Sequence, residues 1–387
     1  MRTGDLRRAG VELRRAVDAA PRDLPAVTAL AQLYERARDL PGRRALLDHT
    51  VSLLRRDVEQ GTIDEPTLRA LASVLALRER PHAATAAAQL LVALKAGGLA
   101  GARDGGGGRS LEGLRRPEAD DRSFPPGIAP GIRQLMRHVG PLLRPSGGEL
   151  GQALARAGVG RADRRARDAA PRPLFAAVAA ELHAGEFDLY VAAGGGPKTG
   201  GAAALRAEPG APPALVIGSP IAALGDAALR FAAARLLRLA STGLDLLLAA
   251  PPEEAAAIVV GIIRQFVPEY RHPAVRDALV EAESARAARV IPRKLRAQLV
   301  AFAVESAGPF DVEALVAAVR DGANAAGLLA AGDLPAALSV LLAARGAANP
   351  SAPPSLAAIV ADPEARALLR FAISDDYDEL ARAIESG

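Results

Sequence analysis

Apolar residues recur every three to four positions along most of the chain, which is the spacing of amphipathic helices. In the first 96 residues this pattern is cut into short segments by turns rich in proline, glycine and charge. Pro41 and Pro81 lie 40 positions apart, and each opens the second helix of a pair, where proline is tolerated. The expected helices cover residues 6–20, 24–38, 43–58, 65–79 and 82–95.

The helical pairs repeat one motif: a helix rich in Leu and Tyr, a short turn, and an Ala-led helix that ends near proline. This motif resembles the tetratricopeptide repeat, whose period is about 34 residues. The spacing here is longer, and the Trp and Gly landmarks of that repeat are absent. The resemblance implies a short α-solenoid over residues 1–96, with a groove for a peptide or a partner helix. A plain helical bundle is the alternative.

Residues 97–130 combine four successive glycines, a charged run and a Pro-Pro pair, with few apolar side chains. That composition predicts a flexible linker. Residues 347–387 predict a C-terminal helical extension, in which Ser374 or Asp375 is the expected N-cap of the last helix.

Between these segments, residues 131–346 are mostly helical in pattern. The alternating segment 187–192 and the apolar segments 202–206 and 214–218 predict strands. We therefore expect a mainly α protein, with a mostly helical α+β domain that contains one small sheet.

Composition narrows the chemistry. The chain of 387 residues has no cysteine, which excludes disulfides, thiolate zinc sites and a cysteine nucleophile. Its net charge is +4, and its basic residues are almost all arginine. Basic residues gathered with aromatics would indicate nucleic-acid binding, and this pattern is absent, so we expect no nucleic-acid partner. The apolar runs at 243–250 and 255–263 are too short to span a bilayer. We expect a cytoplasmic protein without a membrane span.

Three segments, 173–191, 213–237 and 319–342, are similar to a known domain. No single motif in them is specific, and the similarity rests on their order and spacing along the chain. They resemble the degenerate HtpX-like zinc metallopeptidase domain carried by tetratricopeptide proteins of myxobacteria. In active members, a helix bearing His-Glu-x-x-His follows a strand, and a later helix supplies the third zinc ligand.

In this chain, other residue types stand at the positions that correspond to the zinc ligands and the catalytic glutamate. Arg235 and Leu239 stand where the two histidines would be, and Leu236 stands where the catalytic glutamate would be. Arg320 and Asn324 replace the glutamate and aspartate of the later helix. Cations repel zinc, so the resemblance implies a pseudo-peptidase with no metal and no cofactor. Arg235 and Arg320 would approach one another and could contact an anion, or form a salt-bridged remnant of the site.

Two further motifs carry weaker indications. Gly194–Gly200 contains Lys198 and Thr199 and is similar to a phosphate loop, but Pro197 stands where the motif needs glycine. A small acidic cluster with one histidine is either a metal site or a solvated helix end; its members are Glu181, His183, Glu186 and Asp188.

The function expected from these features is a non-catalytic scaffold that binds a protein or peptide. The alternatives are a hydrolase that uses a metal-free site in the same cleft, and a nucleotide-binding protein that acts through Lys198 and Thr199.

Overall fold

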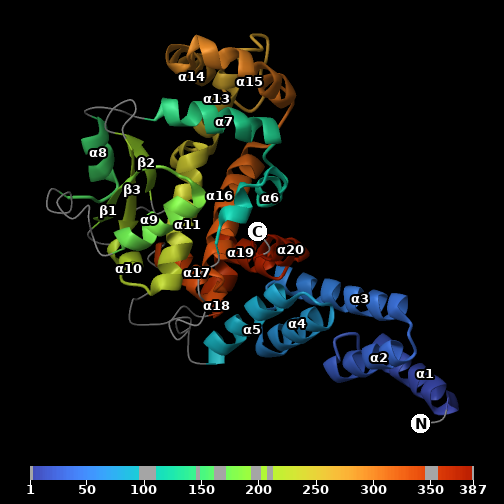
Figure 1. The fold of residues 1–387 in the computed structure, drawn as a ribbon. Helices are drawn as coiled ribbons and strands as arrows, with labels where there is room; N and C mark the ends of the chain where they lie inside the picture. Colours follow the sequence, from blue (N-terminus) through green and yellow to red (C-terminus); the bar gives the residue numbers. More distant parts are fainter. Residues whose placement is uncertain are drawn as a thin grey trace. The chain divides into compact units, whose positions relative to one another are not determined.

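The computed structural model describes residues 3–95, 110–144, 149–160, 171–192, 202–206, 212–344 and 356–385. The chain divides into two compact units. The first comprises Met1–Arg103 and Pro353–Arg382, and the second comprises Asp104–Ala352 and Ala383–Gly387. Both are built mainly from helices, and one small sheet lies in the second, which confirms the predicted fold class (Figure 1).

Five helices form the N-terminal part of the first unit, and each packs against the next. They are α1 (Thr3–Ala19), α2 (Leu24–Arg36), α3 (Leu40–Glu59), α4 (Glu65–Leu77) and α5 (Pro81–Lys95). The starts of α3 and α4 are capped by Asp39 and Asp64, whose side chains accept hydrogen bonds from the backbone of Gly42 and Thr67. Such caps satisfy amides that have no partner within the helix.

The two turns α2–α3 and α4–α5 have the same geometry. Arg38 and Glu79, 41 positions apart, adopt left-handed backbone conformations with φ of 59° and 60°. The residue after each closes the preceding helix in the same way: the N–H of Asp39 bonds to the carbonyl of Tyr34, and that of Arg80 to Leu75. The structural period is therefore 41 residues, longer than the tetratricopeptide period of about 34.

The C-terminal helices belong to this same unit and are not a separate extension. They are α18 (Leu356–Ala361), α19 (Pro363–Ala372) and α20 (Asp375–Glu385). Helix α19 packs against α3 and α5. Ser374 Oγ accepts a hydrogen bond from the N–H of Tyr377, which confirms the expected cap. Arg55 and Arg78 of the repeats both bond to Asp375.

The second unit is built around α11 (Asp226–Thr242) and α16 (Val312–Ala331), which pack closely against each other at its centre (Figure 1). Helices α9 (Arg172–Leu182), α17 (Leu334–Ala344) and α7 (Pro130–Leu143) cover α11. The remaining helices are α8 (Glu149–Arg156), α10 (Ser219–Ala222), α12 (Asp245–Ala249), α13 (Pro252–Ile263), α14 (Asp277–Val290) and α15 (Arg293–Ser306). By length and composition α16 could cross a membrane, but 72% of its most apolar window is buried inside the protein.

The structure corrects the prediction of a linker for residues 110–130. This stretch forms a short 3₁₀ helix, η2 (Glu112–Arg115), and α6 (Pro117–Arg122). Its few apolar side chains, among them Leu111 and Phe124, are buried in the second unit. The ring of Phe124 packs against Gly322 of α16, which leaves no room there for a Cβ atom. The rest of the expected linker, residues 97–109, lies outside the described residues.

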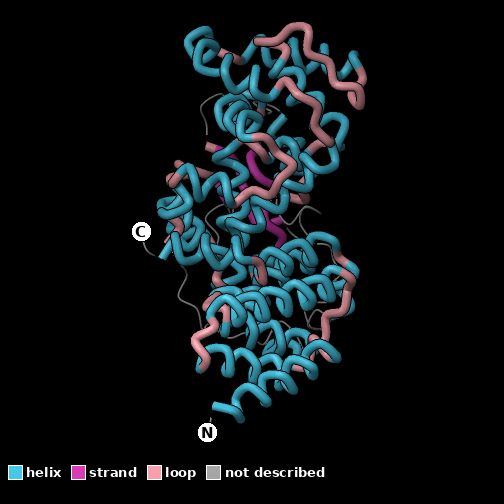
Figure 2. Tube along the Cα trace, turned by 90° about the vertical axis from the view of Figure 1, so that its right-hand side faces the viewer, coloured by secondary structure: helices cyan, strands magenta, loops and turns pink. Residues whose placement is uncertain are grey.

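The predicted strands form one three-stranded sheet in the order β1-β3-β2. Strand β1 (Asp188–Ala192) runs parallel to β3 (Pro213–Gly218), with Tyr190 opposite Val216. Strand β2 (Ala202–Arg206) runs antiparallel on the other side of β3. The central strand is buried almost throughout, as expected of a strand whose residues are nearly all apolar. Figure 2 shows the sheet set among helices of the second unit.

Candidate functional site

A hydrogen bond joins α11 to α16 at the positions where the resemblance placed the zinc site. Arg235 Nε donates to Asn324 Oδ1 over 2.7 Å. Both residues are buried, with exposures of 2% for Arg235 and 1% for Asn324. Four residues earlier on α11, Phe231 lies against Gly327 of α16, so the two helices run antiparallel. One turn further, this register places Leu239 opposite Arg320.

The predicted positions therefore lie along one seam between two helices. Leu236 and Leu239 are buried in the apolar interior of the second unit. Their side chains carry no lone pair for a metal, and a guanidinium repels one, so this set does not fit zinc. Among the described residues, no three His, Asp or Glu side chains gather in a way that could hold a metal ion.

The anion contact expected of Arg235 and Arg320 stays a prediction. Arg235 bonds to the neutral amide of Asn324. Arg320 is half-buried, and its Nε makes no hydrogen bond within the described part of the chain. Arg238, less than one turn along α11 from Arg235, lines a pocket.

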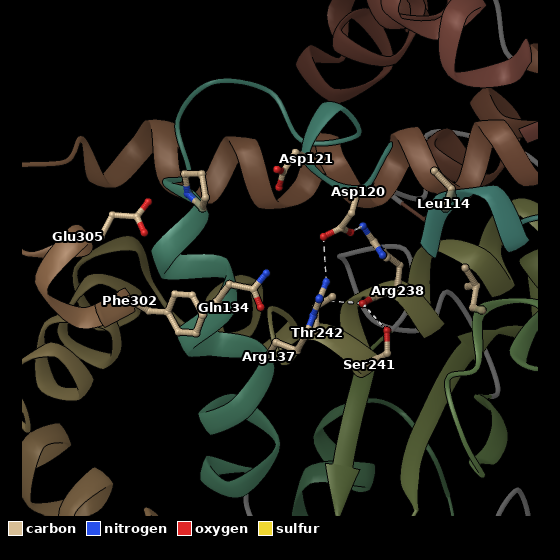
Figure 3. Close-up of a pocket in the computed structure, with 12 residues that line it drawn as sticks. Leu114, Asp120, Asp121, Gln134, Arg137, Arg238, Ser241, Thr242, Phe302 and Glu305 are labelled. Atoms are coloured by element: carbon tan, nitrogen blue, oxygen red, sulfur yellow. Dashed lines mark hydrogen bonds and ion pairs between the residues drawn. The ribbon is translucent and has the colours of Figure 1, made fainter. Parts of the chain in front are cut away.

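This pocket has a volume of about 430 Å³ and lies among η2, α6, α7, α9, α11 and α15 (Figure 3). It combines charged, polar and aromatic side chains. The lining residues are Leu114, Asp120, Asp121, Pro130, Gln134, Arg137, Leu182, Arg238, Ser241, Thr242, Phe302 and Glu305.

Asp120 organises one end of the pocket. Its carboxylate accepts hydrogen bonds from Arg238 Nη2 and from Arg137 Nη2, the second over 2.9 Å. A third arginine, Arg133, donates to the backbone carbonyl of Asp120 and to the carboxylate of Asp121. Three guanidinium groups thus share two carboxylates, which leaves one positive charge in excess at this end.

Burial shifts the pKa of Arg238. Only 7% of its surface is exposed, and this burial lowers the pKa of its guanidinium to about 10. The group remains charged at neutral pH, and it is held between Asp120 and the ring of Phe124, whose centroid lies 5.3 Å from its Cζ atom. Arg133 stacks on the same ring at 5.1 Å. Such cation–π contacts help to hold guanidinium groups away from bulk water.

Sequence reasoning missed this end of the pocket because Asp120 lies in the stretch that resembled a linker. The available indication was the pair Asp120-Asp121 followed by Phe124, which places two acids and an aromatic ring within five residues. No local pattern connects them to Arg238, 118 positions later.

The structure does not bring the members of the acidic cluster, Glu181, His183, Glu186 and Asp188, together in one site. Glu181 bonds to Arg230 over 3.0 Å and to the N–H of Leu111 over 3.1 Å, so it ties α9 to α11 and to the start of η2. A different pocket, of about 760 Å³, is lined by the other members of the acidic cluster, His183, Glu186 and Asp188. The glycine-rich loop with Lys198 and Thr199 lies outside the described residues.

No known protein-family model, curated protein or solved structure matches this chain. The fold and the pocket define a mainly α protein of two helical units, the second of which contains a polar pocket beside its central helix pair.

Proposed function

We propose that the protein is a non-catalytic scaffold whose first unit binds a protein or peptide partner. The stacked hairpins of α2–α3 and α4–α5, with matching turns at Arg38 and Glu79, carry this proposal. Helical repeats that contact only their neighbours present extended surfaces, and such surfaces are widely used to bind partners. Their resemblance to tetratricopeptide repeats supports the same function.

The second unit, in this proposal, is an inactive metallopeptidase-like domain. The support is the hydrogen bond between Arg235 and Asn324, because it fills the seam between α11 and α16 with a cation and an amide. We infer that the protein acts in the cytoplasm without a cofactor or a nucleic-acid partner.

A selection of displayed random peptides against the purified full chain tests the binding function. Enriched peptides are then measured by fluorescence anisotropy against three variants. Leu40→Glu and Val92→Glu change exposed apolar residues of the repeats, whereas Val304→Glu changes an equally exposed residue of α15 in the second unit. The proposal expects weaker binding by at least one of the first two and unchanged binding by the third. Failure to enrich any peptide contradicts it.

Two measurements address the alternative functions. Stoichiometric zinc in the purified protein, or cleavage of casein, would overturn the inactive assignment. Cleavage that a chelator does not block would favour the metal-free hydrolase. A melting temperature that rises with ATP and magnesium would favour nucleotide binding through Lys198 and Thr199.

A further inference from the structure

The pocket beside α11 has opposite charges at its two ends (Figure 3). Asp120, Asp121, Arg137 and Arg238 line one end, and Arg133, which bonds to both aspartates, brings the guanidinium groups there to three against two carboxylates. Glu305 and Phe302, both from α15, lie at the other end. Gln134 of α7 lies between them.

The positive end has donors to spare. A guanidinium group carries five N–H donors, and Arg238 bonds to Asp120 and Ser123 through Nη2. Its Nε is buried and donates no hydrogen bond. A buried donor without an acceptor destabilises the protein. A ligand carboxylate at this end would accept hydrogen bonds from the N–H groups of Arg137 and Arg238 that remain unused, and it would balance the excess charge.

The negative end is equally incomplete. Glu305 is exposed and makes no hydrogen bond or ion pair within the described part of the chain. Its Oε2 atom lies beside the first turn of α7, 3.3 Å from where a Cβ on Gly131 would be. The ring of Phe302 beside this carboxylate is a surface on which an ammonium group can rest.

Gln134 adds a neutral polar group at mid-pocket. Its amide also has no hydrogen-bond partner in the residues that the structure describes. Three groups of different charge thus line one pocket with unused hydrogen-bonding capacity: a buried guanidinium, an amide and a carboxylate. A volume of about 430 Å³ is within the usual range for small-molecule sites.

We propose that this pocket binds a small zwitterion. Its carboxylate lies at Arg238 and Arg137, its ammonium group lies between Glu305 and the ring of Phe302, and Gln134 contacts the segment between them. This site does not depend on the scaffold function, because it uses side chains of the second unit only.

Titration calorimetry on the full chain tests the proposal with linear ω-amino acids: aminobutanoate, aminohexanoate and aminooctanoate. These compounds differ in the distance between their carboxylate and ammonium groups, so the series covers a range of separations between the two ends of the pocket. Hexanoate lacks the ammonium group, and hexylamine lacks the carboxylate. We expect one of the zwitterions to bind at least about tenfold more tightly than either single-charge compound, since each end contributes a charge-assisted contact.

Glu305→Gln provides the decisive variant, because Glu305 is exposed and its replacement does not disturb the buried arginine network. The variant should bind the zwitterion about tenfold more weakly than the wild type and should bind hexanoate with the same affinity. Glu281→Gln, at an exposed position of α14, is the matched control and should change neither. Absence of zwitterion binding at about 10 mM overturns the proposal. So does equal binding of the zwitterion by wild type and Glu305→Gln.

Discussion

Asp378 of α20 accepts a hydrogen bond of 2.8 Å from the backbone N–H of His82, a residue 296 positions earlier in the chain. The same oxygen faces the N–H of Ala83, so a side chain from the last helix caps the first turn of α5. Asp378 is fully buried, and its carboxylate also pairs with Arg382 over 2.8 Å and with Arg80 over 3.8 Å. These contacts of Asp378 bind the C-terminal helices to the repeats.

Replacing Asp378 by Ala should lower the free energy of unfolding of the first unit by about 2–4 kcal/mol, because two amides lose a buried acceptor and two guanidinium groups lose an ion-pair partner. Urea unfolding followed by circular dichroism measures the loss. Asp376→Ala is the matched control, since Asp376 is exposed in the same helical turn. An equal loss in both variants would mean that the helix dipole, and not the cap on α5, is responsible.

The stability of the first unit should fall as the solution becomes acidic. Burial opposes the ionisation of Asp375, but hydrogen bonds from Arg55 and Arg78 outweigh it and lower its pKa from 3.8 to about 2. A carboxyl group whose pKa is depressed by folding stabilises the protein above its unfolded pKa and loses that contribution as the pH falls toward the folded value.

The expected loss is about 1–2 kcal/mol, reduced by the partial exposure of the carboxylate. Unfolding measured at several pH values between 5 and 2 should show it in the wild type. Asp375→Asn should be less stable than the wild type at neutral pH and should show a smaller loss over the same range. Identical pH profiles for the two proteins would contradict the assignment.

The seam between α11 and α16 predicts strong coupling between Arg235 and Asn324. Asn324→Leu removes an acceptor of a buried guanidinium and should cost about 1–3 kcal/mol. Adding Arg235→Met removes the charge as well and should restore part of the loss, since a buried polar pair can often be replaced by apolar groups. Urea unfolding of both single variants and the double variant gives the coupling energy. Simple additivity would show that the bond does not matter to stability.

The packing of Phe124 on α16 predicts that Gly322 tolerates no side chain. Gly322→Ala inserts a methyl group against that ring and should cost about 1–3 kcal/mol through displacement of the 110–130 segment. Gly308→Ala is the control, because an added Cβ there meets no atom within 4 Å. Thermal unfolding compares the two. Little change at Gly322 would indicate that the segment does not pack as described.

Local pattern was enough to predict most helices and all three strands. Helical periodicity and proline placed α3 and α5 within a few residues of their observed starts, because both act through neighbouring residues. The continuous apolar run of β3 likewise predicted a buried strand. The expected cap at Ser374 depended only on residues three positions apart.

The contacts that lie far apart in sequence could not be predicted in this way. Nothing near Asp378 indicates that its partner is the start of α5. Five buried apolar residues in 110–130 were too sparse to reveal that this segment packs within the second unit. At the candidate site, Arg235 and Asn324 fell on one seam as the resemblance implied. The contact between Arg238 and Asp120 could not be predicted, because it depends on how α6 is placed beside α11 in the folded chain.

The first unit is discontinuous, since α19 and most of α20 are separated from α5 by the whole second unit. During synthesis the repeats leave the ribosome long before the helices that cap them. The second unit must therefore be translated while α5 still lacks the acceptor for its first amides. At typical elongation rates of about 5–20 residues per second, that interval lasts roughly 15–60 s. We expect ribosome-bound chains halted before residue 353 to expose the surface of α3 and α5 that α19 later covers, and to depend on chaperones more than the finished protein does.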